Sequence, residues 1–243
     1  MEGVSENKPL NRNEQLMFSN IGRNKYHIGV AIFNNKTYEE NVKWRREHPT
    51  ISCVYGLCKP LSKSFNQGST IFVLEMNNDE NKIMGVGLIL NVSDYSTFKL
   101  YKKREYSNLY IHSSRFHITR EEMLRKDKHN VIEYLENKLF HGCHNFKRLT
   151  GIVNLSFGRI LRDDVSKKRR LVYNCGVCGL PKKNHKCPGK RVKFHKIQLG
   201  DKMCKVCHKK LTRGHICTAK KENKERLTNV LNYFKSLWDF TIK

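Results

Sequence analysis

Long apolar runs are missing from this chain of 243 residues. No stretch of about 18 apolar residues occurs, so we expect no segment to span a membrane. The first ten residues also lack the apolar core of a secretory signal peptide. We therefore expect a reducing compartment, the nucleus or the cytoplasm, where disulfides are rare. Alanine is nearly absent as well, with only Ala31 and Ala219. That bias suits an AT-rich coding genome and excludes no function.

Acidic residues are few relative to basic ones. Asp and Glu number 22 against 47 Lys and Arg, and the formal net charge at pH 7 is +25. The excess concentrates between Arg159 and Arg226, where 22 basic residues accompany 5 acidic ones, an excess of 17. Such a density favours a polyanionic partner, and nucleic acid in particular. An anionic membrane surface fits less well, because no amphipathic helix carries this charge.

One short basic run suggests where the protein acts. The residues from Ser166 to Arg170 (SKKRR) match a nuclear-import pattern. The same run suits the binding of backbone phosphates, or a flexible basic linker between domains. Its sequence does not separate these three interpretations.

Two copies of one metal-binding pattern lie inside the basic segment. Each reads C-x2-C, then a turn of six or seven residues, then H-x-C, and the second copy follows the first by 29 residues. Each copy therefore supplies three thiolates and one imidazole, a full tetrahedral shell for Zn²⁺. We expect two structural Zn²⁺ ions. Their eight ligands are Cys175, Cys178, His185, Cys187, Cys204, Cys207, His215 and Cys217.

The pairing of these ligands stays open. Each quartet can bind its own ion, which closes the shorter loops, or the two can interleave in a cross-braced arrangement. His195 and His208 are available as substitute ligands, and the cysteines can also remain free thiols in a basic tail. With zinc bound, both shells are closed and no carboxylate base lies nearby, so we expect structural rather than catalytic sites. We expect no catalytic residues and no enzyme activity.

Hydrophobic patterning predicts an α+β fold. Strands are predicted at residues 26–33, 51–57, 70–76, 82–90 and 152–157. Helices are predicted at residues 37–48 and 129–140, with a further helix start at the capping box of Thr119 and Glu122. Gly85 and Gly87, inside the fourth strand, indicate a bulge or a close approach of another part of the chain.

Composition divides the chain into four parts. We expect a loosely ordered polar tail at 1–25, a domain at 26–160, the zinc-binding region at 165–220 and a helix at 221–243. The last helix carries one apolar stripe, which is expected to dock on the rest of the chain, with a partner protein as the alternative. The stripe consists of Leu227, Val230, Leu231, Phe234, Leu237 and Trp238.

The run from Gly68 to Asn91, GSTIFVLEMNNDENKIMGVGLILN, resembles the central hairpin of the PUA-like superfamily, which includes the EVE, ASCH and YTH domains. In those small barrels a strand follows a Gly-led turn, and the next strand reads xxGxGxI. The later order of aromatic–basic strands, a helix and H-x-x-KR-x-x-G, from His144 to Gly151, also resembles proteins of nucleocytoplasmic large DNA viruses. The similarity covers about residues 26–160.

This resemblance implies a small PUA-like β-barrel with flanking helices that binds RNA or a modified base. YTH-type readers use a tryptophan-rich cage for a methylated base. This chain has only Trp44 and Trp238, so the resemblance does not imply reading of methyl-adenosine.

Basic and aromatic side chains alternate in the candidate nucleic-acid contacts. Exposed rings stack on single-stranded bases while Lys and Arg neutralise phosphates. Alternatively, the rings face the core, the charges face water, and the lysines of the zinc region only increase solubility. The candidates are Tyr101, Lys102, Lys103, Arg104, Tyr106, Arg115, Phe116, Lys147, Arg148, Lys182, Lys183, Lys186, Lys209, Lys210 and Arg213.

The sequence as a whole favours a zinc-containing protein that binds nucleic acid. RNA or a single strand is favoured over duplex DNA, because the zinc region has no helix long enough to read a major groove. The alternative is a protein-interaction adaptor of a transcription or RNA-processing machinery, which would dock through the zinc fingers and the terminal helix.

Overall fold

The computed structural model describes residues 9–92, 100–101, 109–141, 145–156 and 218–238. The chain divides into two compact units. One comprises Met1–Ile160 together with Asn229–Lys243, and the other comprises Leu161–Thr228. The second unit contains the predicted zinc-binding region 165–220, which lies almost wholly outside the described residues.

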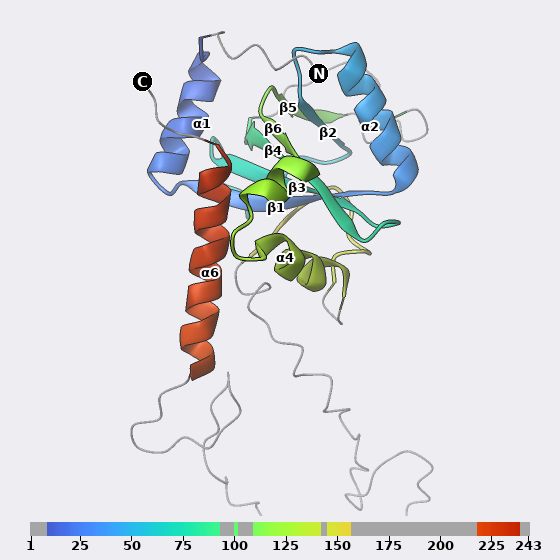
Figure 1. The fold of residues 1–243 in the computed structure, drawn as a ribbon. Coiled ribbons are helices and arrows are strands. Elements are labelled where there is room, and N and C mark those ends of the chain that lie inside the picture. The colour runs from blue at the N-terminus through green and yellow to red at the C-terminus, as the bar shows by residue number, and fades with distance from the viewer. Residues whose placement is uncertain (1–8, 93–99, 102–108, 142–144, 157–217, 239–243) are drawn as a thin grey trace, which may run out of the picture. The chain divides into compact units, whose positions relative to one another are not determined.

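A five-stranded mixed sheet forms the centre of the first unit (Figure 1). Its strands, in spatial order, are β6 (His117–Thr119), β4 (Lys82–Leu90), β3 (Thr70–Asn77), β1 (Tyr26–Phe33) and β7 (Ile152–Asn154). Strands β1 and β3 are parallel, and the other pairs are antiparallel. A separate two-stranded sheet pairs β2 (Cys53–Leu57) with β5 (Tyr110–Ser114).

The α+β class is confirmed, but the expected closed barrel is not found among the strands that the structure describes. The five-stranded sheet is open, with β6 and β7 at its edges. Strand β7 has only three residues and pairs with β1 alone, so it does not reach back to β6. The parallel β1–β3 pair requires a crossover connection, and this chain supplies it through α2 (Asn35–Glu47) and β2.

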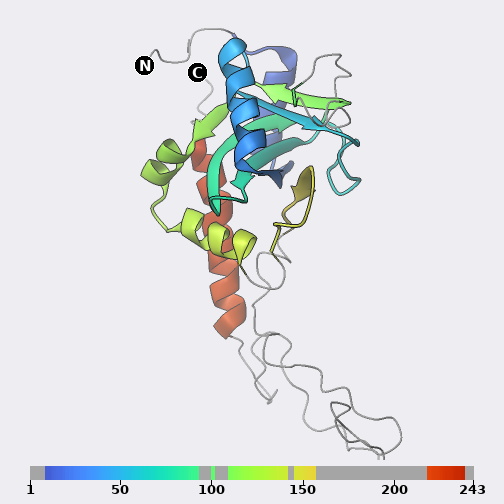
Figure 2. The ribbon, with the colours of Figure 1, turned by 90° about the vertical axis from the view of Figure 1, so that its right-hand side faces the viewer.

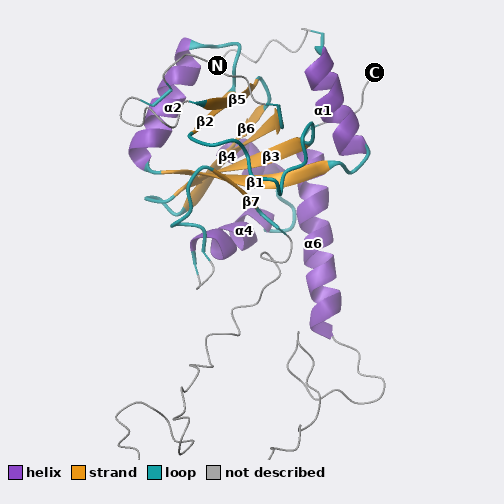
Figure 3. Cartoon of the chain, turned by 180° about the vertical axis from the view of Figure 1, so that it is seen from behind, coloured by secondary structure: helices purple, strands orange, loops and turns teal. Residues whose placement is uncertain are grey.

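Strand β3 is buried along its whole length, because both faces of the sheet are covered. Phe72 and Leu74 face one layer, which contains α3 (Arg120–Lys126), α4 (Val131–Phe140) and part of α6 (Thr218–Leu237). Ile71 and Val73 face the opposite layer, built from α2 and the β2–β5 sheet. Figure 3 shows the large sheet between these layers, and Figure 2 shows α2 nearest the viewer.

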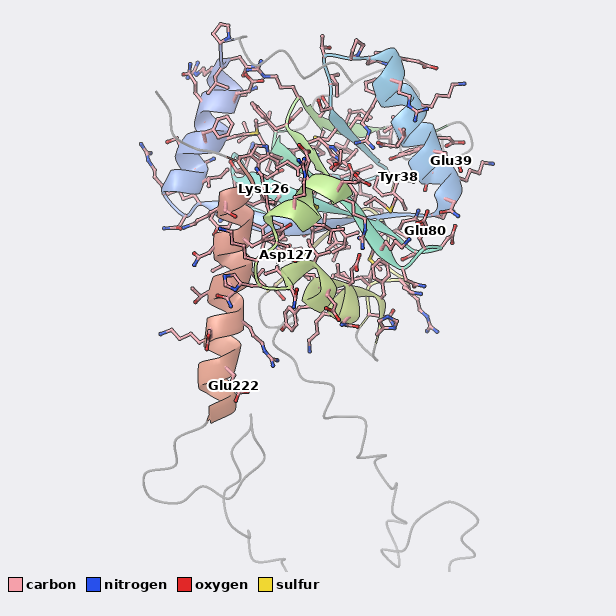
Figure 4. All side chains as sticks on the ribbon, viewed as in Figure 1. Tyr38, Glu39, Glu80, Lys126, Asp127 and Glu222 are labelled. Carbon is pink, nitrogen blue, oxygen red and sulfur yellow. The ribbon has the colours of Figure 1, made fainter. Side chains whose placement is uncertain are left out.

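Helix α2 begins where the β3–β4 turn meets it. Asn34 caps its first turn, and Asp79 of the turn accepts a hydrogen bond from the Asn35 backbone N–H at 2.9 Å. In Figure 4, Glu80 of this turn lies beside the end of α2 that carries Tyr38 and Glu39. The helix ends before Pro49, as predicted.

The prediction of a loosely ordered tail at 1–25 is wrong for residues 12–22, which form helix α1 (Arg12–Gly22). A capping box of Asn11 and Glu14 begins the helix. Met17 and Ile21 are buried in the core, where α1 covers one end of β3 and β4. The sequence of α1 is polar on average, and two of its four buried residues are the polar Glu14 and Asn20, so its composition gave no signal of packing.

The prediction that the terminal stripe docks on the same chain is confirmed for the last turns of α6. Val230, Phe234 and Leu237 are fully buried against the sheet, and the Phe234 ring lies 5.5 Å from that of Phe72. The stripe also includes Tyr233, which the sequence did not predict; its hydroxyl donates to the Met123 carbonyl oxygen at 2.9 Å.

Two residues at the end of α3 fix its neighbours. Lys126 donates a hydrogen bond to the Leu237 carbonyl oxygen at the end of α6. The Asp127 carboxylate accepts the backbone N–H groups of Val131 and Ile132, which begin α4. Figure 4 labels Lys126 and Asp127 beside α6.

Because α1 and the last turns of α6 both pack in the core, the domain predicted at 26–160 is incomplete without them. Over the part of the chain described here, the helices include none with the length and apolarity needed to cross a membrane.

Candidate functional site

A small chamber lies where the carboxyl ends of β1 and β2 meet the start of β7. Its volume is about 220 Å³. Its lining residues include three buried aromatic residues: Phe33 at the end of β1, Tyr55 in β2, and Tyr101. Thr37 from the first turn of α2 and Thr150 before β7 add hydroxyl groups. The lining thus combines buried aromatic residues with hydroxyl-bearing ones.

A wider groove of about 500 Å³ adjoins the chamber. The two hollows share part of their lining, including Leu57, Cys58 and Thr150. The groove adds Lys59 and the hydroxyls of Ser62 and Ser64. A chamber with aromatic lining residues, next to a groove that contains one lysine and several hydroxyls, suits a ligand with a ring and an attached polar or anionic chain.

Behind the chamber lies a fully buried carboxylate, that of Glu75 in β3. The Tyr55 hydroxyl donates to its Oε1 at 3.0 Å, and the His117 Nε2 lies 3.1 Å from its Oε2. Arg45 of α2 places its Nη1 3.4 Å from Oε1 and donates to the Ser52 carbonyl oxygen at 3.0 Å. Four elements (α2, β2, β3 and β6) therefore meet at this one carboxylate.

Two glycines on the neighbouring strand make room for these partners. Gly85 lies opposite Glu75 in the β3–β4 register. A Cβ at Gly85 would lie 2.7 Å from the His117 ring, and one at Gly87 would lie 2.3 Å from the Tyr55 hydroxyl. Any side chain at either position would displace the network. The close approach predicted from the G-x-G of this strand is confirmed, and a register shift after Glu75 supplies the bulge.

The charges of this network fix its protonation. Burial alone would raise the pKa of Glu75, but His117 and Arg45 outweigh it and lower that pKa to about 2. Burial, with Glu75 nearby, raises the pKa of the Cys53 thiol to about 12. Burial and Glu75 likewise raise the pKa of Tyr55. Glu75 is thus ionised at neutral pH, while the Cys53 thiol and the Tyr55 hydroxyl keep their protons. Cys53 is chemically inert in this state.

Asn41 of α2 fixes the second tyrosine of the chamber. Its Nδ2 donates to the Val54 carbonyl oxygen at 2.7 Å and to the Tyr101 hydroxyl at 3.4 Å. Burial raises the pKa of Tyr101 to about 12. The Oδ1 of Asn41 is buried and has no hydrogen-bond partner among the described residues.

The structure corrects part of the expected basic–aromatic strip. Tyr101 is a buried wall of the chamber and not an exposed ring. Phe116 packs edge-on against Phe18, with centroids 5.0 Å apart. Arg115 forms an ion pair with Glu14 of α1 at 2.8 Å. Phe116 and Arg115 therefore hold α1 to the sheet, because each already has a partner within the fold.

Lys147 and Arg148 lie in the connection before β7. The Lys147 ammonium lies 5.9 Å from the centre of the Phe140 ring, and Arg148 is exposed. Both positions leave a positive charge at the surface.

The remaining predicted contacts and all predicted zinc ligands lie outside the described residues. They are Lys102, Lys103, Arg104, Tyr106, Lys182, Lys183, Lys186, Lys209, Lys210 and Arg213, with Cys175, Cys178, His185, Cys187, Cys204, Cys207, His215 and Cys217. Within the ranges that the structure does describe, no three His, Cys, Asp or Glu side chains gather as a metal site would require.

Sequence reasoning missed Glu75 and its partners. A signal was present, because Glu75 is the only charge in the apolar strand TIFVLEM, and a buried carboxylate needs a partner. The partners could not be identified, since Arg45, Tyr55 and His117 come from three other elements.

The fold and the candidate site are described from the geometry of this chain alone. Comparison of this chain with protein-family models, with curated proteins and with solved structures gave no match.

Proposed function

We propose that this protein binds nucleic acid, RNA or a single strand in preference to duplex DNA, and that its chamber holds one unpaired base. The observation that carries the proposal is the chamber itself, with its three aromatic lining residues and the lining that it shares with the groove containing Lys59. A volume of about 220 Å³ is below the usual range for drug-sized ligands, about 300–1,000 Å³, and suits a single ring system. Paired bases cannot enter such a chamber, which favours single strands.

Phosphate affinity is assigned to the basic segment. The excess of 17 positive charges between Arg159 and Arg226 supplies attraction for a polyanion without sequence preference. Two structural Zn²⁺ ions on the eight predicted ligands would hold this segment in shape, and a closed Cys₃His shell supplies folding energy and no reaction. In this proposal the core unit contacts a base while the zinc region contacts the backbone.

A PUA-like relation is part of the same proposal. It is supported by the Gly-led turn before β3 and by Gly85 and Gly87 of β4, which lie in the central hairpin of the sheet. The packing of β2–β5 over one face of this sheet also supports it, as an opened variant of a small barrel.

The adaptor alternative loses one of its two docking elements. The apolar stripe of α6 that would bind a partner is occupied, because Val230, Phe234 and Leu237 pack in the core of this chain. We therefore keep nucleic-acid binding as the function that the site supports best.

Neutralising the zinc-region cations should weaken binding and flatten its salt dependence. Each phosphate contact contributes about −0.7 to the slope of log affinity against log salt on single strands. The variant replaces Lys182, Lys183, Lys186, Lys209, Lys210 and Arg213 by Gln. The measurement is fluorescence anisotropy with a single-stranded RNA at several salt concentrations, together with elemental analysis, which should give two zinc ions per chain in both proteins.

A matched control removes the same charge elsewhere. It replaces six exposed cations of the first unit: Arg23, Lys25, Lys36, Lys43, Arg46 and Lys128. This control should reduce the slope less than the zinc-region variant does. An unchanged affinity and slope in the zinc-region variant, with zinc still bound, would favour the adaptor function instead.

Blocking the chamber should remove the contribution of the bases and leave the contribution of the phosphates. Thr150 is exposed and lines both hollows, so Thr150→Trp should fill the entrance without disturbing the core. The affinity for a mixed-sequence single strand should fall to that for an abasic strand of equal length, a loss of about 1–3 kcal/mol for one stacked base. Leu124→Trp, at an exposed position on α3, is the control and should leave both affinities unchanged. Equal binding of the intact strand by Thr150→Trp and the natural chain would exclude the chamber as a base site.

A further inference from the structure

We infer that the outer edge of β7 is a docking site for an extended acidic peptide of a partner protein, which adds to the large sheet as a further strand. Among the described strands, β7 pairs only with β1, so it is an edge strand. The groove of about 500 Å³ lies along it, because the lining includes all three residues of the strand. The inference goes beyond the proposed function and does not depend on it.

The hydrogen-bond register shows which backbone groups of β7 face away from β1. The Leu155 N–H, just beyond the end of the strand, donates to the Ile28 carbonyl oxygen at 2.8 Å. In an antiparallel pair the backbone groups of alternate residues face the partner strand, so those of Val153 also point to β1. The N–H and C=O groups of Ile152 and Asn154 therefore point outward. Among the described residues, none forms a backbone hydrogen bond with these four groups.

Residues 58–64, which follow β2, form the other wall of the groove. The Asn154 side chain donates to the Ser64 carbonyl oxygen at 2.8 Å, which ties this loop to the strand. Leu61 adds apolar surface to this wall, and Ser62 adds a hydroxyl. An open strand edge beside a preformed groove is the arrangement required for strand addition. Backbone hydrogen bonds then give affinity, and the walls beside the edge select side chains.

The charge around the groove selects an acidic partner. Lys59 is an exposed lining residue, and the exposed Lys63 belongs to the same loop. Arg148 is exposed two residues before Thr150, which lines the opposite wall. The described lining contains no Asp or Glu. Carboxylates on an extended segment would therefore meet cations on both sides of the groove.

Two other occupants fit this edge less well. A second copy of the chain would bring two of these basic grooves together, and each chain has a formal net charge of +25. A nucleic-acid backbone presents phosphate oxygens, which only accept hydrogen bonds. The outward carbonyl oxygens of Ile152 and Asn154 would oppose such a backbone. A peptide strand alternates donors and acceptors as the edge of β7 does, so it satisfies both kinds of group.

The site is tested by random-peptide display on the full-length chain, followed by fluorescence anisotropy with the selected peptides. These peptides should be rich in Asp, Glu and β-branched residues. Asn154→Pro removes one outward N–H, and proline is tolerated where an edge strand faces solvent. Asn154→Ala is the matched control, because it also loses the side-chain bond to Ser64 but keeps the N–H. Asn154→Pro should bind the peptides about tenfold more weakly than Asn154→Ala, because one peptide carbonyl group is left unpaired.

N-methylated peptides test the backbone pairing directly. Methylation at alternate residues of a selected peptide should abolish binding when the methyl groups replace the N–H groups that face β7. Methylation at the intervening residues, whose N–H groups face away, should leave the affinity nearly unchanged. Lys59→Glu should weaken the binding of acidic peptides by about fivefold at low salt, and high salt should reduce this difference.

Failure to select any peptide, or equal peptide affinities in Asn154→Pro and Asn154→Ala, would overturn the inference. A groove that holds a nucleic-acid strand instead predicts that Asn154→Pro weakens single-stranded RNA binding relative to Asn154→Ala, and that result would also overturn it. Self-association of the natural chain in sedimentation equilibrium, lost in Asn154→Pro and kept in Asn154→Ala, would assign the edge to a second copy.

Discussion

Replacing Glu75 by Gln should lower the free energy of unfolding by about 3–5 kcal/mol, the usual cost of removing one partner from a buried ion pair. The substitution leaves the buried Arg45 guanidinium without a counter-charge and removes the carboxylate oxygen that lies next to the His117 ring. Tyr55 would also lose the acceptor that a carboxylate offers. Urea denaturation followed by circular dichroism measures this change. Glu80→Gln is the control, because the Glu80–Lys82 pair is exposed, and its removal should change the free energy by less than about 0.5 kcal/mol.

The same carboxylate predicts how stability depends on pH. The pKa of Glu75 in the folded chain is about 2, below its ordinary value of 4.5. A lowered pKa contributes stability that is fully present above pH 4.5 and is lost as the pH falls toward 2. The difference in unfolding free energy between the natural chain and Glu75→Gln should therefore shrink over this interval. A difference that stays constant from pH 5 to pH 2.5 would show that Glu75 is not held ionised by its partners.

A chain that stops at residue 160 should fail to form the native core, although it contains every strand of the sheet. Such a chain lacks Val230, Phe234 and Leu237, which cover Phe72 on one face of the sheet. Truncation of a single buried phenylalanine costs about 3–5 kcal/mol, and here a whole helix turn and its neighbours are lost. Total stability is about 5–15 kcal/mol for ordinary domains, so we expect loss of cooperative unfolding and of near-ultraviolet circular dichroism.

The matched variant keeps α6 and removes the basic segment instead. Residues 161–217 are replaced by a Gly/Ser linker of about 20 residues, with a root-mean-square span of about 25 Å. This chain should unfold cooperatively and should not respond to a zinc chelator, whereas in the natural chain chelation should affect the 161–228 unit alone. A chain ending at residue 160 that unfolds as cooperatively as the linker variant would show that α6 is dispensable.

Local patterns could predict much of the fold. The β3–β4 hairpin follows from two apolar runs around an Asn/Asp turn, and α4 follows from its apolar face. Helix α1 could not be predicted in this way, because its stability depends on contacts such as that between Glu14 and Arg115, which are 101 residues apart. The open edge of the sheet could not be predicted for the same reason, because it also depends on contacts between distant parts of the chain. The residues of each strand indicate a strand, but only the tertiary pairing determines whether the last strand closes on the first.

The candidate site was less predictable than the fold, since its residues come from separate elements. The rings of the chamber were visible as ordinary aromatic residues, and Tyr101 was assigned to an exposed strip although it lies in a wall. Burial turns such a ring from an exposed contact into part of a wall, and burial is determined only when the layers assemble. The zinc quartets are the opposite case, because ligands at short spacing form one site through local chain geometry.

The insertion of a long segment between β7 and α6 also fixes the timing of folding during synthesis. The core of the first unit is incomplete until residues 229–238 have been made. At about 5–20 residues per second, the ribosome needs roughly 4–16 s to proceed from residue 161 to residue 238. During that interval the Phe72 face of the sheet is uncovered while the strongly basic segment emerges. A nascent chain that stalls in this segment would therefore expose apolar strands beside a polycation, and such a product would be recognised by chaperones and proteases as unfinished.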